Sequence, residues 1–234
     1  MRRLGFRTVL TLAAAFTPVS VLAQSAKPQA YSVMAPFEQY ASPNTAFEVA
    51  LARSAAPAAI SGAADILVLG PSGYAAGARG ANGFVCLVER SWNTYFDDPE
   101  FWNPKVRAPN CYNAAAARTV LPAYLSRTQW ALQGLSAAEI RTRLEAEIKN
   151  GAITAPQIGA MSYMTSKDSY LGDAVGHSHP HLMIYLPPAE PSVWGANLAG
   201  GPVTADRGTP EPLTIFFVPT PNWSDGTAVH APTP

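Results

Sequence analysis

Three of the four histidines in this chain fall within five positions, at His177, His179 and His181. Imidazole is the commonest protein ligand for transition metals, so this spacing indicates metal chemistry. In an extended segment the three rings point to one side, because side chains alternate. Rings two positions apart are then separated by about 6.6 Å and can hold one ion, whereas the outer two are about 13 Å apart and cannot share it. The predicted site is one histidine pair with a ligand from elsewhere, or all three rings around a kink at Pro180.

Asp173, in the segment before the histidines, is the expected additional ligand. Two imidazoles with Asp173 or a third histidine would leave an open position for water, as in catalytic zinc sites. Water bound to such an ion becomes a nucleophile near neutral pH. Copper is equally compatible with imidazole ligands in an exported protein, so zinc and copper both stay open as cofactors. In the alternative interpretation no metal binds, and the histidines hydrogen-bond neighbouring carbonyls or pair with Asp173.

Residues 92–102 contain five aromatic and three acidic side chains in eleven positions. Rings beside carboxylates can form the wall of a ligand pocket, with the acids available for proton transfer. The alternative is a long loop whose rings pack onto the sheet while its acids stay solvated, because five large rings are unfavourable in water. The candidate ligand-binding residues are Trp92, Tyr95, Phe96, Trp102 and, from a later strand, Tyr163.

Short apolar runs bounded by glycine, proline and polar residues predict the strands that position these side chains. The predicted strands are 65–70, 83–89, 160–166, 181–186 and 213–218, with a bulged strand around Tyr74.

Apolar residues at helical spacing predict helices at 45–55, 114–133 and 136–149, the second with a break near Pro122. Thr45 and Ser136 each precede a glutamate by three positions, which is the spacing of a capping box. We therefore predict a single α+β domain, with a mostly antiparallel sheet and helices packed against one face.

Residues 1–23 have the pattern of a secretory signal peptide. An arginine-rich start is followed by an apolar run that is too short to span a membrane comfortably, and small residues precede the expected cleavage after Ala23. The mature protein is expected in the periplasm or outside the cell, by either the general or the twin-arginine route, with no stable membrane insertion. We divide the remainder into an extended leader at 24–43, the domain at 44–222 and a flexible tail at 223–234.

The mature chain has little net charge. Without the three arginines of the signal, 13 basic residues stand against 16 acidic ones, a formal net charge near −3. Such a balance gives no basis for a nucleic-acid partner. Its oligomeric state is left open, and a small molecule is the expected partner.

Cys86 and Cys111 are the two cysteines of the chain, and export places them in an oxidising compartment. A disulfide between them is the prediction. The alternatives are two buried free thiols, or Cys86 as a soft metal ligand near the histidines.

Three stretches carry a resemblance to other proteins: G-H-S-H-P-H-L-M at 176–183, N-G-F-V-C-L-V-E-R-S-W at 82–92 and D-P-E-F-W-N-P at 98–104. Together they resemble a group of secreted bacterial proteins with which no activity is associated. The resemblance spans most of the mature chain and implies export and a shared fold. It implies no mechanism. The His-x-His element is also similar to cupin metal sites, but the carboxylate that cupins place shortly downstream is missing after His181.

The motifs of zinc peptidases, serine hydrolases and dithiol oxidoreductases, H-E-x-x-H, G-x-S-x-G and C-x-x-C, are absent. Our first hypothesis is therefore that the protein is exported and binds a metal. In its enzymatic form, this hypothesis makes it a metal-dependent enzyme that acts on a small molecule through the histidine cluster. The alternative is a non-catalytic periplasmic or extracellular protein that binds a ligand with the aromatic loop 92–102. Whether the protein is an enzyme stays open at this point.

Overall fold

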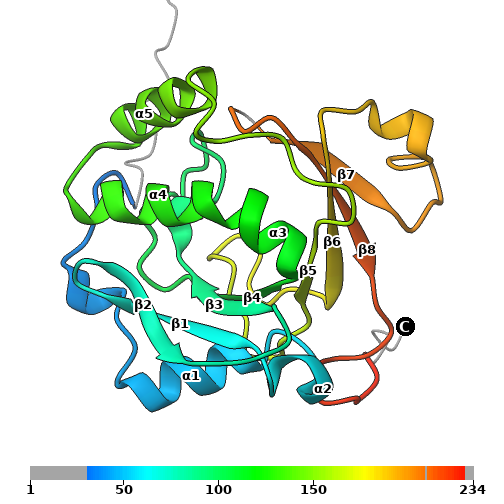
Figure 1. Cartoon of the computed structure of the whole chain (residues 1–234), viewed down its shortest axis with the longest axis horizontal. Helices are drawn as coiled ribbons and strands as arrows, with labels where there is room; N and C mark the ends of the chain where they lie inside the picture. The colour runs from blue at the N-terminus through cyan, green and yellow to red at the C-terminus, as the bar shows by residue number, and fades with distance from the viewer. Residues whose placement is uncertain (1–30, 209, 230–234) are drawn as a thin grey trace, which may run out of the picture.

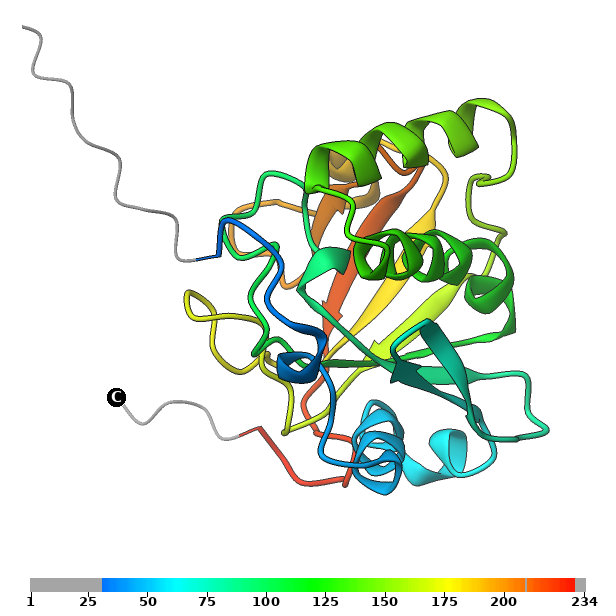
Figure 2. The same ribbon diagram turned by 90° about the vertical axis from the view of Figure 1, so that its left-hand side faces the viewer.

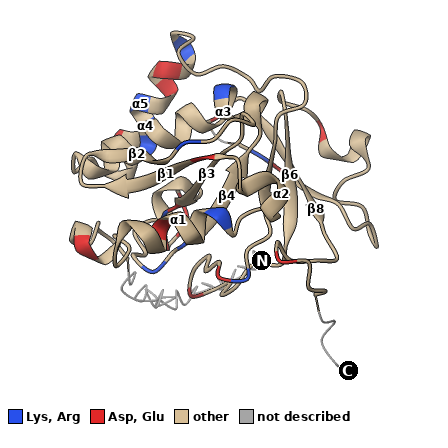
Figure 3. Cartoon of the chain, turned by 60° about the horizontal axis from the view of Figure 1, so that its bottom comes forward, with Lys and Arg blue, Asp and Glu red and all other residues tan. Residues whose placement is uncertain are grey.

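The computed structural model describes residues 31–208 and 210–229. The predicted signal peptide and His230 lie outside the described residues. Among the described residues no helix is both long and apolar enough to cross a membrane. In the described part of the chain, acidic and basic residues are interspersed over the elements, and no helix or strand there carries a long run of one sign (Figure 3).

One sheet of eight strands forms the centre of the described chain (Figure 1). The strands are β1 (Asp65–Gly70), β2 (Gly73–Ala78), β3 (Val85–Glu89), β4 (Ala108–Tyr112), β5 (Met161–Met164), β6 (His181–Leu186), β7 (Thr204–Arg207) and β8 (Thr214–Pro219). In space they follow the order β2-β1-β3-β4-β5-β6-β8-β7. Neighbouring strands are antiparallel except β1 and β3, which are parallel. The predicted α+β class with a mostly antiparallel sheet is confirmed.

Helices lie on both faces of this sheet (Figure 2). The α-helices are α1 (Thr45–Arg53), α2 (Ala58–Ser61), α3 (Ala114–Thr119), α4 (Leu121–Leu132) and α5 (Ala137–Lys149), and three short 3-10 helices lie at Phe37–Gln39, Ser91–Asn93 and Pro191–Trp194. We predicted that helices pack against one face of the sheet. Helices α3 and α4 pack on one face, and α5 packs on α4. On the other face, α1 covers Cys86 and Val88 of β3. Because β3 is apolar on both sides, both of its faces need cover.

Helix α1 begins one residue earlier than a Thr45 capping box requires. Its N-cap is Asn44, whose Oδ1 accepts a hydrogen bond from the Phe47 amide over 2.9 Å. Glu48 does not cap the helix, since its carboxylate turns inward to Arg90. Phe47, an apolar residue in the first turn of α1, is 50% exposed.

The other helix predictions agree more closely with the structure. The long alanine-rich segment divides at Val120 into α3 and α4, and Pro122 lies in the first turn of α4, where its missing N–H is harmless. The capping box between Ser136 and Glu139 at the start of α5 is confirmed.

Strand β4 was not predicted, because Ala108-Pro109-Asn110 is typical of a loop. All five of its residues are buried between β3 and β5. The Cα atoms of the opposed Cys86 and Cys111 are 3.9 Å apart, as in a non-hydrogen-bonded pair. Hydrogen-bonded and non-hydrogen-bonded pairs alternate along an antiparallel ladder. Pro109 and Val88 lie two positions from the cysteine pair, so they also form a non-hydrogen-bonded pair. The missing N–H of Pro109 therefore costs no hydrogen bond to β3.

The edge strand β7 was also not predicted, because its residues are largely exposed and polar. Asn197, which has a left-handed φ of 59°, lies beside this edge. Its side-chain amide donates to the Ala205 carbonyl and accepts from the Ala205 amide, both over 2.8 Å. Its own backbone amide donates to the Val203 carbonyl. The outward backbone groups at Val203 and Ala205 are thus already bonded.

The predicted disulfide between Cys86 and Cys111 is present and joins β3 to β4. The described ends of the chain are attached to the domain. In the leader, Tyr40 is fully buried and its hydroxyl donates to the Trp102 carbonyl. In the tail, the Ser224 amide donates to the Thr165 carbonyl.

Candidate functional site

The three clustered histidines do not share one strand. Strand β6 begins at His181, so His177 and His179 lie in the preceding loop, and both are exposed. His177 Nδ1 is 2.5 Å from the Ser169 carbonyl, and His181 Nδ1 is 2.8 Å from the His179 carbonyl. Burial lowers the pKa of His181, whose ring also contacts Phe217. The rings of His177 and His181 therefore have the backbone contacts of the alternative interpretation.

Asp173 makes its contacts away from these rings. It accepts hydrogen bonds from Tyr170, Tyr31 and Lys105, and those bonds lower the pKa of its carboxyl. Within residues 31–208 and 210–229, no group of three or more His, Cys, Asp or Glu side chains could hold a metal ion. The residues predicted as ligands thus do not gather as a group of three in the described part of the chain.

The aromatic loop 92–102 mostly packs inward. Trp92 and Trp102 are buried in the core beneath α4, and Trp92 Nε1 donates to Thr128 Oγ1 over 2.9 Å. The Arg127 guanidinium lies over the Phe96 ring, with its central carbon 4.3 Å from the ring centroid. Of the predicted ligand-binding residues, Tyr95 borders the mainly apolar cavity described below.

Tyr163 lies elsewhere. Its ring packs near Phe84 on the α1 side of the sheet and borders a separate depression of about 300 Å³ with Pro57 and Trp223. The structure therefore does not bring Tyr163 together with the aromatic loop.

A cavity of about 270 Å³ lies on the face of the sheet that carries α4, and we call it the Glu89 cavity. Register explains its floor: Glu89 is opposite Ala108 and Met183 is opposite Phe217, so the side chains of each pair share a face. The floor is formed by Glu89, Ala108, Asn110, Met164, Met183, Ile215 and Phe217. The remaining lining comes from α4, the segment 90–100, Val106, Leu171, Gly208, Glu211 and Leu213.

Glu89 is a buried acidic residue in the lining of this cavity. It ends β3 and is 8% exposed. Its Oε1 accepts hydrogen bonds from Tyr112 Oη and from Asn110 Nδ2, the latter over 3.1 Å. Burial raises the pKa of Glu89 to about 7, although both hydrogen bonds and the nearby Arg127 charge act to lower it. A carboxyl with such a pKa can both donate and accept a proton near neutral pH.

The tyrosine that donates to Glu89 is itself held by a second buried tyrosine. Tyr112 stacks on Tyr185 with ring centroids 6.1 Å apart, and Tyr185 Oη lies 2.9 Å from Ser162 Oγ. Burial raises the pKa of both phenols, so both are neutral hydroxyls at physiological pH. This packing fixes the hydroxyl that holds Glu89 Oε1.

Several polar groups that line the Glu89 cavity have no hydrogen-bond partner among the described residues. They are Ser91 Oγ, Asn110 Oδ1 and both polar atoms of the Asn93 amide. Leaving a buried polar group unpaired costs roughly 1–3 kcal/mol, so folded proteins seldom do it without a reason. A bound molecule that pairs with these groups is such a reason.

One wall of the cavity is held by a buried ion pair. Arg127 Nη1 donates to Glu211 Oε1 over 2.8 Å. The same guanidinium donates to the carbonyls of Trp92 and Thr94. Arg127 thus ties α4 to the aromatic loop and keeps Glu211 paired.

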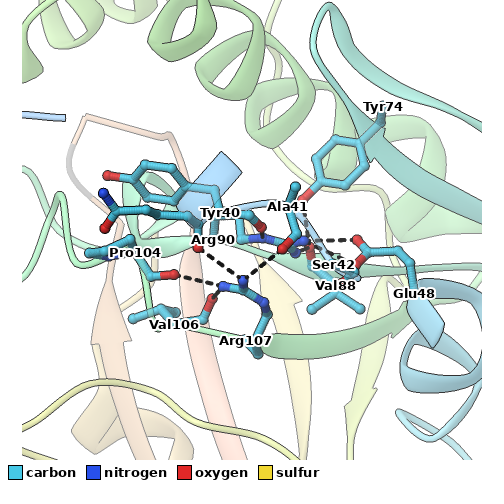
Figure 4. Close-up of polar contacts among 11 residues, drawn as sticks. Tyr40, Ala41, Ser42, Glu48, Tyr74, Val88, Arg90, Pro104, Val106 and Arg107 are labelled. Atoms are coloured by element: carbon cyan, nitrogen blue, oxygen red, sulfur yellow. Dashed lines mark hydrogen bonds and ion pairs between the residues drawn. The ribbon is translucent and has the colours of Figure 1, made fainter. Parts of the chain in front are cut away.

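Arg90, the residue after Glu89, bonds to α1 and to the segment before α1 (Figure 4). Arg90 is fully enclosed, donates to both carboxylate oxygens of Glu48 over 3.0 Å and also donates to the Tyr40 carbonyl. Arg107 donates to the Pro104 and Val106 carbonyls next to it. These contacts attach α1 and the leader to the strand end that carries Glu89.

Glu89, Asn110 and Arg127 were not predicted as site residues. One signal for Glu89 was visible in the sequence: an acidic residue directly follows the apolar run Phe84-Val85-Cys86-Leu87-Val88. Because side chains alternate along a strand, Glu89 lies on the same face as Leu87. Its significance depends on the pairing with β4, which local pattern did not reveal.

Comparison with family models, curated proteins and solved structures finds no match for this chain. The resemblance to secreted bacterial proteins therefore stays a prediction.

Proposed function

We propose that the mature chain is an exported protein, periplasmic or secreted, that binds a small molecule in the Glu89 cavity. Glu89 is the group that exchanges a proton or a hydrogen bond with that molecule. The observation that carries the proposal is a buried carboxyl at the end of an apolar cavity, beside polar side chains that lack partners. This conclusion keeps part of the ligand-binding hypothesis for the aromatic loop, through Tyr95.

The apolar lining supports binding of a molecule with an apolar body. Met164, Met183 and Phe217 form the floor, and Leu213 and Val106 add further apolar surface. Small-molecule sites commonly combine such a lining with a few placed polar groups. A raised carboxyl pKa inside a cavity is likewise a common mark of a functional site.

Methionine methyl NMR tests the proposal, because two of the methionines line the cavity. Protein labelled with ¹³C at the methionine methyl groups is titrated with the neutral probe 2-phenylethanol. We expect saturable shifts for Met164 and Met183, with Met34 and Met161 as internal controls outside the lining. The Ala108→Phe variant, which fills the floor, should abolish the shifts. Absence of saturable shifts in the wild-type protein, or equal shifts at all four methyls, would contradict the proposal.

A further inference from the structure

Around Glu89, the lining of the cavity holds hydrogen-bond acceptors without donors among the described residues, beside one unpaired amide donor, Asn93 Nδ2. Both donors that reach Glu89 bond to Oε1, so Oε2 has no hydrogen bond from the described residues. Asn110 uses its amide nitrogen on Glu89, which leaves its Oδ1 as an unpaired acceptor. Asn110 is 99% enclosed and faces the cavity side of the sheet, since its partner in the ladder is Leu87. A molecule that pairs with these two acceptors must therefore bring donors.

The charges around the cavity indicate the sign of that molecule. Both arginines in the lining are already paired, Arg90 with Glu48 and Arg127 with Glu211. Glu89 forms no ion pair with any described residue. A buried carboxylate without a counter-charge is unfavourable, and a bound cation would offset that cost.

Two more carboxylates lie along the same cavity. Asp98 accepts hydrogen bonds from Thr94 and the Glu100 amide, and Glu100 accepts from Asn103 and from the backbone amides of the loop at 173–174. Neither has a cationic partner among the described residues, so both add negative potential to the lining. No free cation of the described lining balances them.

On the basis of the small-molecule binding proposed above, we infer that the ligand is a primary amine with an apolar body, bound as its ammonium ion. The ammonium group donates to Glu89 Oε2 and Asn110 Oδ1, and its third N–H is available to Ser91 or Asn93. The apolar body lies against Met164, Met183 and Phe217. No covalent step is involved.

A matched pair of probes tests this inference. Phenethylamine and 2-phenylethanol have nearly the same shape, and they differ in charge and in the number of donors. At pH 8, we expect wild-type protein to bind the amine roughly tenfold or more tightly than the alcohol, the scale of one charge-assisted hydrogen bond. Affinities are read from the Met164 and Met183 methyl shifts.

The Glu89→Gln variant locates the origin of the preference. Glutamine keeps the size and can still accept from Tyr112 and Asn110, so the variant should lose the preference for the amine over the alcohol. Glu145→Gln, on the exposed face of α5, is the matched control and should behave as wild type.

The outcomes separate the two proposals. Equal or tighter binding of the alcohol by the wild type overturns the amine inference and leaves small-molecule binding intact. Binding of neither probe overturns both. An amine preference that survives in Glu89→Gln removes Glu89 as the counter-charge. The wild-type comparison requires no variant, so the inference is tested even if Glu89→Gln fails to fold.

Discussion

Replacing Glu89 with glutamine should make the protein more stable at high pH and leave it unchanged at low pH. Below about pH 4.5 the wild-type carboxyl is protonated in both the folded and the unfolded chain, and it resembles the glutamine amide. As the pH rises, the unfolded chain loses this proton first, while the folded chain keeps it until about pH 7. The folded state therefore loses stability across this interval. A pKa raised from 4.5 to about 7 corresponds to about 3 kcal/mol of unfolding free energy.

The groups that face Glu89 set this value and are the same in both proteins. They are Tyr112 and Asn110 from β4, Tyr185 from β6, and Tyr124 and Arg127 from α4. Carboxyls with a lowered pKa, such as Asp173, also make stability depend on pH, but with the opposite sign, and they cancel in the comparison.

Urea denaturation of wild type and Glu89→Gln at pH 4.5 and pH 8 provides the measurement. The variant should gain about 3 kcal/mol relative to wild type between the two pH values. The exposed Glu145→Gln substitution should show no comparable gain. If the difference between wild type and Glu89→Gln is the same at both pH values, Glu89 does not titrate near neutrality and its assigned role is wrong.

Three further substitutions test the supports of the site by denaturation. Replacing Cys86 and Cys111 together with alanine should lower the unfolding free energy by about 3 kcal/mol, since the bridge closes a loop of sequence separation 25; an unchanged denaturation midpoint would contradict this. Arg127→Leu should cost about 3 kcal/mol because it leaves Glu211 buried without its partner, and adding Glu211→Leu should restore much of the loss. A double variant no more stable than Arg127→Leu would show that the ion pair is not the cause. Ser136→Ala should cost about 1 kcal/mol through loss of the α5 cap, and no fall in thermal midpoint would exclude that contribution.

The sheet was largely predictable because most strands are short apolar runs between turn residues. The predicted strand at 181–186 coincides with β6, and that at 65–70 with β1. Strand β4 escaped prediction because Pro109 and Asn110 favour loops, and their burial depends on strands on both sides. The conformational preferences of single residues do not reveal that β4 pairs with strands on both sides.

The candidate site was less predictable. Spacing alone places three imidazoles near one another but cannot tell whether their nitrogens meet a metal or a carbonyl, and here His177 and His181 contact carbonyls. Glu89 carries no motif. Its chemistry arises from enclosure beneath α4 and from Tyr112, which becomes its neighbour only when β3 and β4 pair.

The amide of Asn197 has a consequence for how copies of the protein behave together. An unpaired sheet edge is a template onto which another chain can add a strand, and such growth leads to fibres. By bonding to Ala205 on both its amide and its carbonyl, Asn197 imitates one residue of a ninth strand and ends the ladder there. The folded protein thus carries its own barrier to edge-to-edge self-assembly at β7.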